Sequence, residues 1–148
     1  MNEIKIFGEP KPGENYTHRH VTSAVIIDGQ GQVAVVLVGD RHFLPGGGIE
    51  AGETEIEALV RELREECARE VVIGARLGDA VFYQYTTTYG GWCIHSAYYR
   101  ADFGRLLDVA PEPNHTLMFL EPYEARARLF RKSDVWAVTA ALSPALHP

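Results

Sequence analysis

The stretch LPGGGIEAGETEIEALVRELREECAR, from Leu44 to Arg69, joins a glycine-rich turn to a segment that carries many carboxylates. Thr54 is a typical helix N-cap, and Glu57 stands three residues later, as in a capping box. Strong helix formers fill positions 55 to about 70, with no proline or glycine among them. The stretch therefore predicts a turn whose backbone can approach a ligand closely, followed by a helix.

This helix has an apolar stripe and a separate acidic face. Glu62, Glu65 and Glu66 share one face, where like charges three and four residues apart repel one another. A solvated surface balanced by arginines is one interpretation of that face, and a metal site is the other. The glycine turn favours the metal site, because Mg²⁺ prefers carboxylate oxygens, water and phosphate. The apolar stripe, expected to face a core, consists of Ile56, Leu59, Val60, Leu63 and Cys67.

The order of these residues resembles the Nudix box, G-x5-E-x7-R-E-U-x-E-E-x-G-U, where U is aliphatic. Ala68 and Arg69 depart from it, because the family has glycine and an aliphatic residue there. Either Ala68 takes a left-handed conformation or the helix continues. The resemblance implies a single Nudix hydrolase domain over residues 1–148, an α/β/α sandwich with a mixed sheet between helices. The matching positions are Gly47, Glu53, Arg61, Glu62, Leu63, Glu65 and Glu66.

The resemblance also implies a metal site and an activity. Glu62, Glu65 and Glu66 would bind Mg²⁺ or Mn²⁺ with the backbone carbonyl of Gly46, and Gly46 and Gly47 would lie against the substrate. The reaction would be hydrolysis of a phosphoanhydride in a nucleoside diphosphate linked to another moiety. The run L-P-G-G-G-I-E-A-G-E-T is similar to the MutT-like group, which favours a nucleoside triphosphate, cut to a nucleoside monophosphate and pyrophosphate.

Other functions stay open. A dinucleoside polyphosphate and a sugar nucleotide are alternative substrates. A Nudix-like sensor that binds nucleotide without cutting it is an alternative of another class, which the intact carboxylates disfavour.

Two roles beside the metal ligands follow from the same resemblance. Arg61 would orient a box carboxylate, and Glu53 would support Arg61; the alternative is a surface pair, or no pair at all. Glu62 is the first candidate for the general base. Glu112, in a loop between two prolines, is the second, and it could equally be an exposed loop acid.

Aromatic residues outside the box are candidates for substrate recognition. Tyr83, Tyr85 and Tyr89 alternate along one predicted strand, with Trp92 and His95 on the next. A base could stack there, or a helix could cover this face instead. Tyr85 also lies sixteen positions past the end of the box, which resembles a weak marker of the diadenosine-polyphosphate group.

Length, charge and cysteine content limit the possible partners and location of the protein. The chain has 148 residues and a formal net charge of -6, which predicts no general attraction to nucleic acid or anionic membrane. Neither a signal peptide nor a membrane span is visible. Cys67 and Cys93 lack metal-ligand spacing and are expected to be buried thiols in a reducing cytoplasm. The sequence does not decide between a monomer and a homodimer.

The sequence also predicts the order of elements. A turn at 28–31 is expected to join two strands as a hairpin, and Gly90 and Gly91 to join two more. Ser133 is expected to cap the last helix. The expected strands are 4–7, 20–27, 32–38 (a central strand), 42–44, 71–89 (broken at Gly74 and Gly78), 92–102 and 116–120, and the expected helices are 55–70, 121–131 and 133–142.

Overall fold

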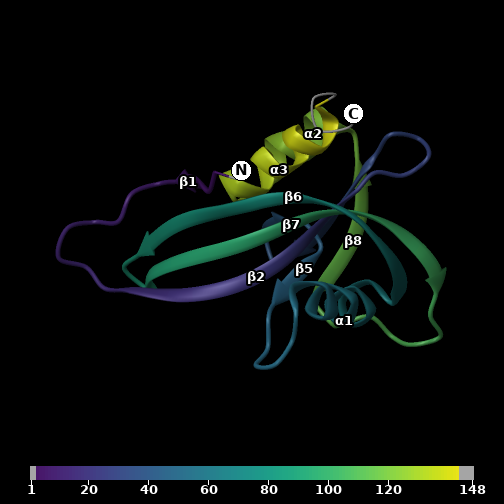
Figure 1. Cartoon of the computed structure of the whole chain (residues 1–148), viewed down its shortest axis with the longest axis horizontal. Coiled ribbons are helices and arrows are strands. Elements are labelled where there is room, and N and C mark those ends of the chain that lie inside the picture. The colour runs from purple at the N-terminus through teal and green to yellow at the C-terminus, as the bar shows by residue number, and fades with distance from the viewer. Residues whose placement is uncertain (1–2, 144–148) are drawn as a thin grey trace.

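The structure, a computed structural model, describes residues 3–143 as two β-sheets and three helices (Figure 1). One sheet has the strand order β1-β6-β7-β2-β5 and the other the order β4-β3-β8. The first sheet is mixed, because β1 with β6 and β2 with β7 are parallel pairs and the rest are antiparallel. The elements are β1 Lys5–Phe7, β2 Tyr16–Ile26, β3 Val33–Val38, β4 Arg41–Phe43, β5 Gly46–Gly48, α1 Glu55–Cys67, β6 Arg69–Thr86, β7 Gly90–Leu106, β8 His115–Leu120, α2 Pro122–Arg128 and α3 Lys132–Leu142.

Helices α1 and α3 cover opposite faces of the five-stranded sheet, as Figure 1 shows. On one face, Leu59 and Leu63 of α1 pack into a cluster with small residues of β2 and β7. On the other face, Val138 of α3 packs with Val25 and Tyr98. The predicted α/β/α arrangement with a mixed sheet is therefore confirmed. None of the three helices within residues 3–143 has the length and apolarity to cross a membrane.

The predicted hairpin at 28–31 is wrong, although the turn itself is present. Asp28 accepts hydrogen bonds from the N–H groups of Gln30 and Gln32, both at 2.9 Å. Only a single bridge, Ile27 to Val33, follows before β2 and β3 enter different sheets. The reason lies in β3, which is apolar on both faces and forms the centre of its own sheet, as expected for a central strand.

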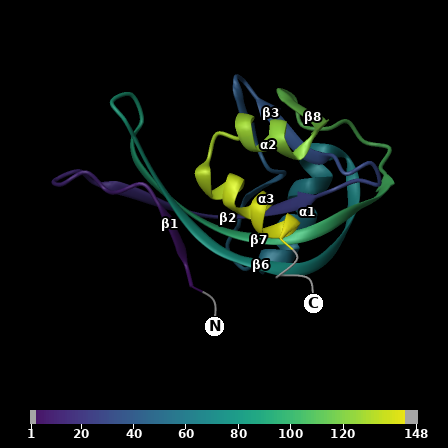
Figure 2. The ribbon, with the colours of Figure 1, turned by 90° about the horizontal axis from the view of Figure 1, so that it is seen from above.

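Strand β2 begins at Tyr16, four residues before the predicted start. Its first residues are polar and exposed, but they pair with β7 in parallel register, His18 opposite Cys93 and His20 opposite His95. In Figures 1 and 2 this part of β2 and the far end of the β6–β7 hairpin project beyond the helices. The hairpin is confirmed, with its turn at residues 87–89 rather than at Gly90 and Gly91.

Helix α1 buries a different edge from the predicted one. Leu59, Leu63 and Cys67 are buried as expected, but Ile56 is 46% exposed. Glu66 is buried in its place, at 7% exposure. The helix is therefore turned so that one carboxylate of its acidic face points inward. The Thr54–Glu57 capping box is present at its N-terminus.

Several element ends also differ from prediction. Helix α1 stops at Cys67, because Ala68 takes the left-handed conformation with φ 55° and ψ 41°. The two glycines expected to break β6 instead coincide with irregular pairing between Ile73 and Gly78. Helix α2 ends at Arg128 rather than near 131. Arg131, not Ser133, is the N-cap of α3, because that helix begins at Lys132, two residues earlier than a cap at Ser133 would allow.

A buried carboxylate connects α3 to the segment that leads into β5. Asp134 is 1% exposed and accepts hydrogen bonds from the Tyr98 hydroxyl at 2.7 Å and the Leu44 N–H at 3.1 Å. Burial raises its pKa. These contacts hold the residues just before β5 in one position, because a buried carboxylate strongly favours the arrangement in which hydrogen-bond donors reach its oxygens.

Tyr98→Phe is expected to lower the free energy of unfolding by roughly 1–3 kcal/mol, because it leaves a buried carboxylate without one donor. Urea unfolding followed by circular dichroism measures this change. Tyr123→Phe is the matched control, since Tyr123 is 78% exposed and its variant should behave as the parent. Equal stability of the two variants would show that the Tyr98 hydroxyl contributes nothing.

Candidate active site

The carboxylates of α1 meet the backbone of β5. The turn predicted at Gly46–Gly48 is instead this strand, which pairs with β2. The N–H of Gly46 donates to Oε1 of Glu66 at 3.0 Å. A Cβ on Gly47 would lie 2.4 Å from Cδ of Glu62. Because β5 has no side chains at these positions, two box carboxylates can lie directly against its backbone.

Arg61 connects the carboxylates to one another and to β5. It donates to both oxygens of Glu53, from Nε at 2.6 Å and from Nη2 at 2.9 Å, so the predicted contact is present. Its Nη1 donates to Glu62 at 3.0 Å and contacts Glu65 at 3.3 Å, and its Nη2 donates to the carbonyl of Gly48 at 2.9 Å. The hydrogen bond from Arg61 lowers the pKa of Glu53. A guanidinium held this way has one orientation, and it fixes Glu62 in turn.

The three metal-ligand candidates differ in burial. Burial raises the pKa of Glu66 to about 7, against the opposing effects of the Gly46 N–H and of His115. Burial also raises the pKa of Glu62, against the effect of Arg61. Glu65 lies at the outer edge, with its side chain 52% exposed. The cluster thus runs from a buried carboxylate to a solvent-facing one.

These oxygens suit a hard divalent cation. Within residues 3–143, the only ion-pair contact of Glu66 is with His115, at 3.6 Å from Oε2 to Nε2. A buried carboxylate with so little positive charge nearby is costly in its ionised form. Mg²⁺ or Mn²⁺ would supply that charge and prefers oxygen ligands. The donor set therefore fits the expected metal.

The loop that carries Glu112 lies against α1. The N–H of Glu112 donates to the backbone carbonyl of Glu65 at 2.8 Å. His115, at the start of β8, places Nε2 3.9 Å from Glu112 and donates from Nδ1 to the carbonyl of Pro113 at 3.0 Å. Both candidate bases are therefore close to the carboxylate cluster without any movement of the loop. From the sequence, His115 could assist the base or be an ordinary surface group, and the structure places it beside Glu66 and Glu112.

A cleft with cationic and aromatic walls leads away from the carboxylates. One cavity of about 190 Å³ reaches Glu66, and a neighbouring cavity of about 220 Å³ continues it. Arg19, Phe43 and Arg131 line both cavities, and the Arg131 guanidinium lies 4.9 Å from the centre of the Phe43 ring. The outer cavity is also lined by Arg41, Gln84, Tyr89, Trp92, Ile94 and Phe130.

The sequence identified only part of this cleft. Tyr89 and Trp92 line it, but the arginines come from separate strands and loops and share no spacing that could have revealed them. Tyr83, Tyr85 and His95 are not brought to the cleft. They alternate with Gln84 and Ile94, which line it, so they lie on the opposite face of the sheet.

Other neighbours surround these three residues on that face. Tyr83 and Tyr85 pack on Tyr16, with ring centres 5.6 and 6.4 Å apart. The His95 ring stacks on His20 at 4.7 Å. Burial and the neighbouring His20 and His18 lower the pKa of His95.

Gly47→Ala is expected to keep the fold and to lower kcat by roughly 10²-fold, the cost of displacing a catalytic group by about 1 Å. The new Cβ meets the flexible end of Glu62, so the side chain can move while the backbone stays. Kinetics on the best substrate, together with thermal unfolding, measure both effects. Gly29→Ala is the control, because no atom lies within 4 Å of its added Cβ. Parent-like kinetics in Gly47→Ala would show that the position of Glu62 is unimportant.

Comparison with known proteins gives relatives in sequence and in structure. Over 58 residues the chain is 47% identical to "Putative 8-oxo-dGTP diphosphatase 2" of Mycobacterium tuberculosis, in strains CDC 1551 / Oshkosh and ATCC 25618 / H37Rv. This match covers 37% of the chain and 41% of the relative, so the chain spans less than half the length of these curated relatives.

Solved structures share the fold over most of its length. The Escherichia coli ORF135 protein aligns with a TM-score of 0.68 and 24% identity, over 90% of this chain and 95% of that one. A MutT protein from Bacillus halodurans aligns with a TM-score of 0.62 and 19% identity, over 88% and 83% of the two chains. The NUDIX domain profile matches residues 17–141, most of the sequence. The chain belongs to the NUDIX domain family.

Proposed function

We propose that this chain is a MutT-like pyrophosphohydrolase that uses Mg²⁺ or Mn²⁺ to cut a phosphoanhydride bond. The substrate would be a nucleoside diphosphate linked to another moiety, with a nucleoside triphosphate giving a nucleoside monophosphate and pyrophosphate. The main support is the position of Glu66, a buried carboxylate held by the Gly46 N–H at the end of an arginine-lined cleft. Such a site favours a bound cation and a negatively charged substrate at the same place.

The carboxylate cluster would hold the metal. When bound, the ion neutralises charge on phosphate oxygens and lowers the pKa of a water molecule. Arg61 keeps Glu62 and Glu65 in place, because Glu53 and the Gly48 carbonyl fix its own orientation. The proposed ligands are Glu62, Glu65, Glu66 and the backbone carbonyl of Gly46.

Hydrolysis requires a base for the attacking water. The water oxygen bonds to a phosphorus, the anhydride P–O bond breaks, and its electrons leave with the departing phosphate oxygen. A carboxylate takes the proton of the water. Glu62 is the first candidate, because Arg61 holds it within the carboxylate cluster, where a metal-bound water would lie within its reach. Glu112 is the second, since its loop is bonded to α1 beside the same cluster.

The cleft walls would bind the rest of the substrate. Arg19 and Arg131 can contact phosphates, because both line the cavity that reaches Glu66. Phe43 and Trp92 offer ring faces to a base in the outer cavity. A dinucleoside polyphosphate or a sugar nucleotide would use the same phosphate contacts. Tyr85, the sequence feature that favoured the dinucleotide, lies on the other face of the sheet and no longer supports it.

A substrate panel tests the proposal. Nucleoside triphosphates, 8-oxo-dGTP (suggested by the name of the mycobacterial relative), diadenosine polyphosphates and sugar nucleotides are incubated with Mg²⁺ or Mn²⁺. Chromatography should resolve a nucleoside monophosphate and pyrophosphate from at least one triphosphate, and chelator should stop their release. Hydrolysis in ¹⁸O-labelled water identifies the phosphorus attacked. Nucleotide binding without turnover across the panel would instead indicate a sensor.

A further inference from the structure

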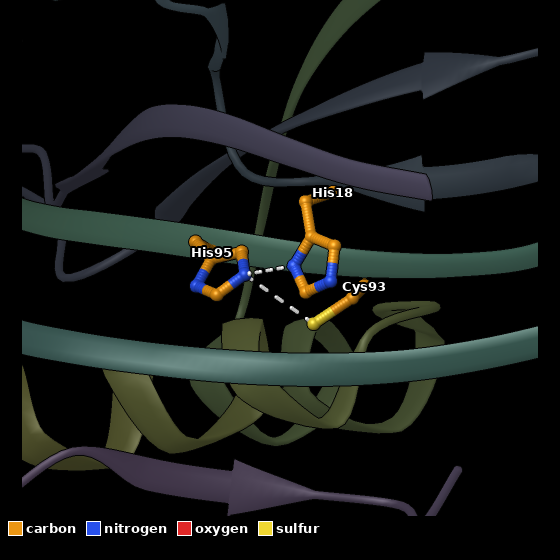
Figure 3. Close-up of side chains that lie close together, drawn as sticks. All are labelled: His18, Cys93 and His95. Carbon is orange, nitrogen blue, oxygen red and sulfur yellow. Dashed lines mark hydrogen bonds between the residues drawn. The ribbon is translucent and has the colours of Figure 1, made fainter. Parts of the chain in front are cut away.

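Three side chains with atoms of the kinds that ligate metals meet on the sheet face opposite the cleft. His18 comes from β2, and Cys93 and His95 come from β7. His18 is the register partner of Cys93 in the parallel pair, so both side chains project to the same face. His95 follows two residues later and therefore shares that face. Figure 3 shows the three side chains pointing toward one another.

The three donor atoms all lie within 4.8 Å of one another, and the two distances to His95 are slightly shorter than they would be around a metal ion. Nδ1 of His18 and Nε2 of His95 are 2.8 Å apart, and Sγ of Cys93 is 3.4 Å from the same Nε2. A tetrahedral Zn²⁺ with bonds of about 2.0–2.3 Å would need about 3.3 Å between the nitrogens and about 3.6 Å between nitrogen and sulfur. Opening the cluster by a few tenths of an ångström is enough to admit an ion.

The donors also determine which ions fit. Imidazole nitrogen and thiolate sulfur favour Zn²⁺ and similar transition metals, whereas Mg²⁺ and Mn²⁺ favour carboxylate oxygen. The cluster thus differs in kind from the glutamates of α1. His18 is exposed to solvent, which leaves room for a water molecule as a fourth ligand. The Tyr83 hydroxyl contacts the Cys93 thiol and supports the position of this ligand.

We propose that His18, Cys93 and His95 form a second metal site, for Zn²⁺, separate from the carboxylate site. On binding, the histidine that donates the shared N–H carries its proton on its other ring nitrogen instead, so both rings ligate as neutral imidazoles, and only the thiol proton passes to solvent. The bound ion then links β2 to β7 where the two strands extend past the helices (Figures 1 and 2). Spacing along the chain does not indicate this site, since the ligands are brought together only by the register of two parallel strands.

Cobalt titration of the full chain tests this site. Co²⁺ is added with excess Mg²⁺, which occupies the carboxylate cluster, and a phosphine reductant keeps the thiols reduced. A tetrahedral thiolate site should give a sulfur-to-cobalt charge-transfer band and intense visible bands, and Zn²⁺ should remove both by displacement. The parent should also unfold at a higher temperature with Zn²⁺, because the ion binds the folded state.

Matched variants locate the site. Cys93→Ser should abolish the charge-transfer band, and His18→Ala should weaken Co²⁺ binding by at least about tenfold. His42→Ala, which removes a histidine from β4, should bind Co²⁺ as the parent does. No band in the parent, or a band that survives Cys93→Ser, would overturn the second site. His18→Ala should hydrolyse nucleotides with Mg²⁺ at the parent rate, so failure here leaves the proposed hydrolase activity standing.

Discussion

Glu66→Gln is expected to lower kcat by at least about 10²-fold on the best substrate while leaving the fold intact. The substitution keeps the shape of the side chain, and its amide oxygen can still accept the Gly46 N–H. It removes one negative charge from the proposed metal ligands, so the ion is held less tightly and less accurately. Steady-state kinetics over a range of Mg²⁺ and Mn²⁺ concentrations measure both effects.

The same substitution should raise the stability of the metal-free protein at neutral and alkaline pH. Burial raises the pKa of Glu66 from 4.5 to about 7, so between these values the folded chain binds more protons than the unfolded chain. The free energy of unfolding therefore falls as pH rises from 5 to 8, by roughly 3 kcal/mol from this group. Urea unfolding in chelator at pH 5 and pH 8 should show this loss in the parent and much less of it in Glu66→Gln.

Glu70→Gln provides the matched control for these experiments. Glu70 pairs with Arg64 at 3.0 Å just past the end of α1, and its side chain is 34% exposed. The charge change is the same, but it lies outside the carboxylate cluster. Parent-like kcat in Glu66→Gln, or equal losses in both variants, would show that the metal is held elsewhere.

Glu62→Gln is expected to weaken metal binding and to lower kcat by roughly 10²–10⁴-fold, the usual contribution of a general base. Glu112→Gln should leave the metal affinity unchanged and kcat near the parent value. The difference follows from position, because Arg61 holds Glu62 within the cluster, whereas the Glu112 side chain is 47% exposed. The Glu112 variant keeps its loop in place, since the contact to α1 is made by the backbone N–H.

The pH–rate profile separates the two candidate bases. If Glu62 is the base, Glu112→Gln retains the acid limb of the profile. If Glu112 is the base, its variant should lose that limb and at least about 10²-fold of kcat at unchanged metal affinity. That second pattern would contradict the assignment of Glu62.

The site features that the sequence predicted correctly are local ones. The capping box of α1 and the contact of Arg61 with Glu53 depend on residues at fixed spacing within one turn and one helix. Local spacing is preserved when such a segment folds, so the pattern can be read directly. The burial of Glu66 was not predicted, because the rotation of α1 depends on what packs against it.

Features that depend on strand pairing were not predictable in the same way. The strand that carries His18 and Arg19 was expected to begin only at His20, because its first residues are polar. Register then decides which face each side chain takes: Arg19 lines the cleft, and His18 and His95 meet on the opposite face. A single sequence does not specify which residues of β2 pair with which residues of β7.

The parallel pairing of β2 with β7 also has a consequence for folding kinetics. Its partners, such as His18 and Cys93, are 75 positions apart in the chain, whereas β6 and β7 are joined by a short turn. Contacts between distant residues form slowly, because the loop between them must first close. We therefore expect the β6–β7 hairpin to form early and β2 to dock late. Arg19 on the cleft face of β2 and His18 on its other face would then reach their final positions in the same late step.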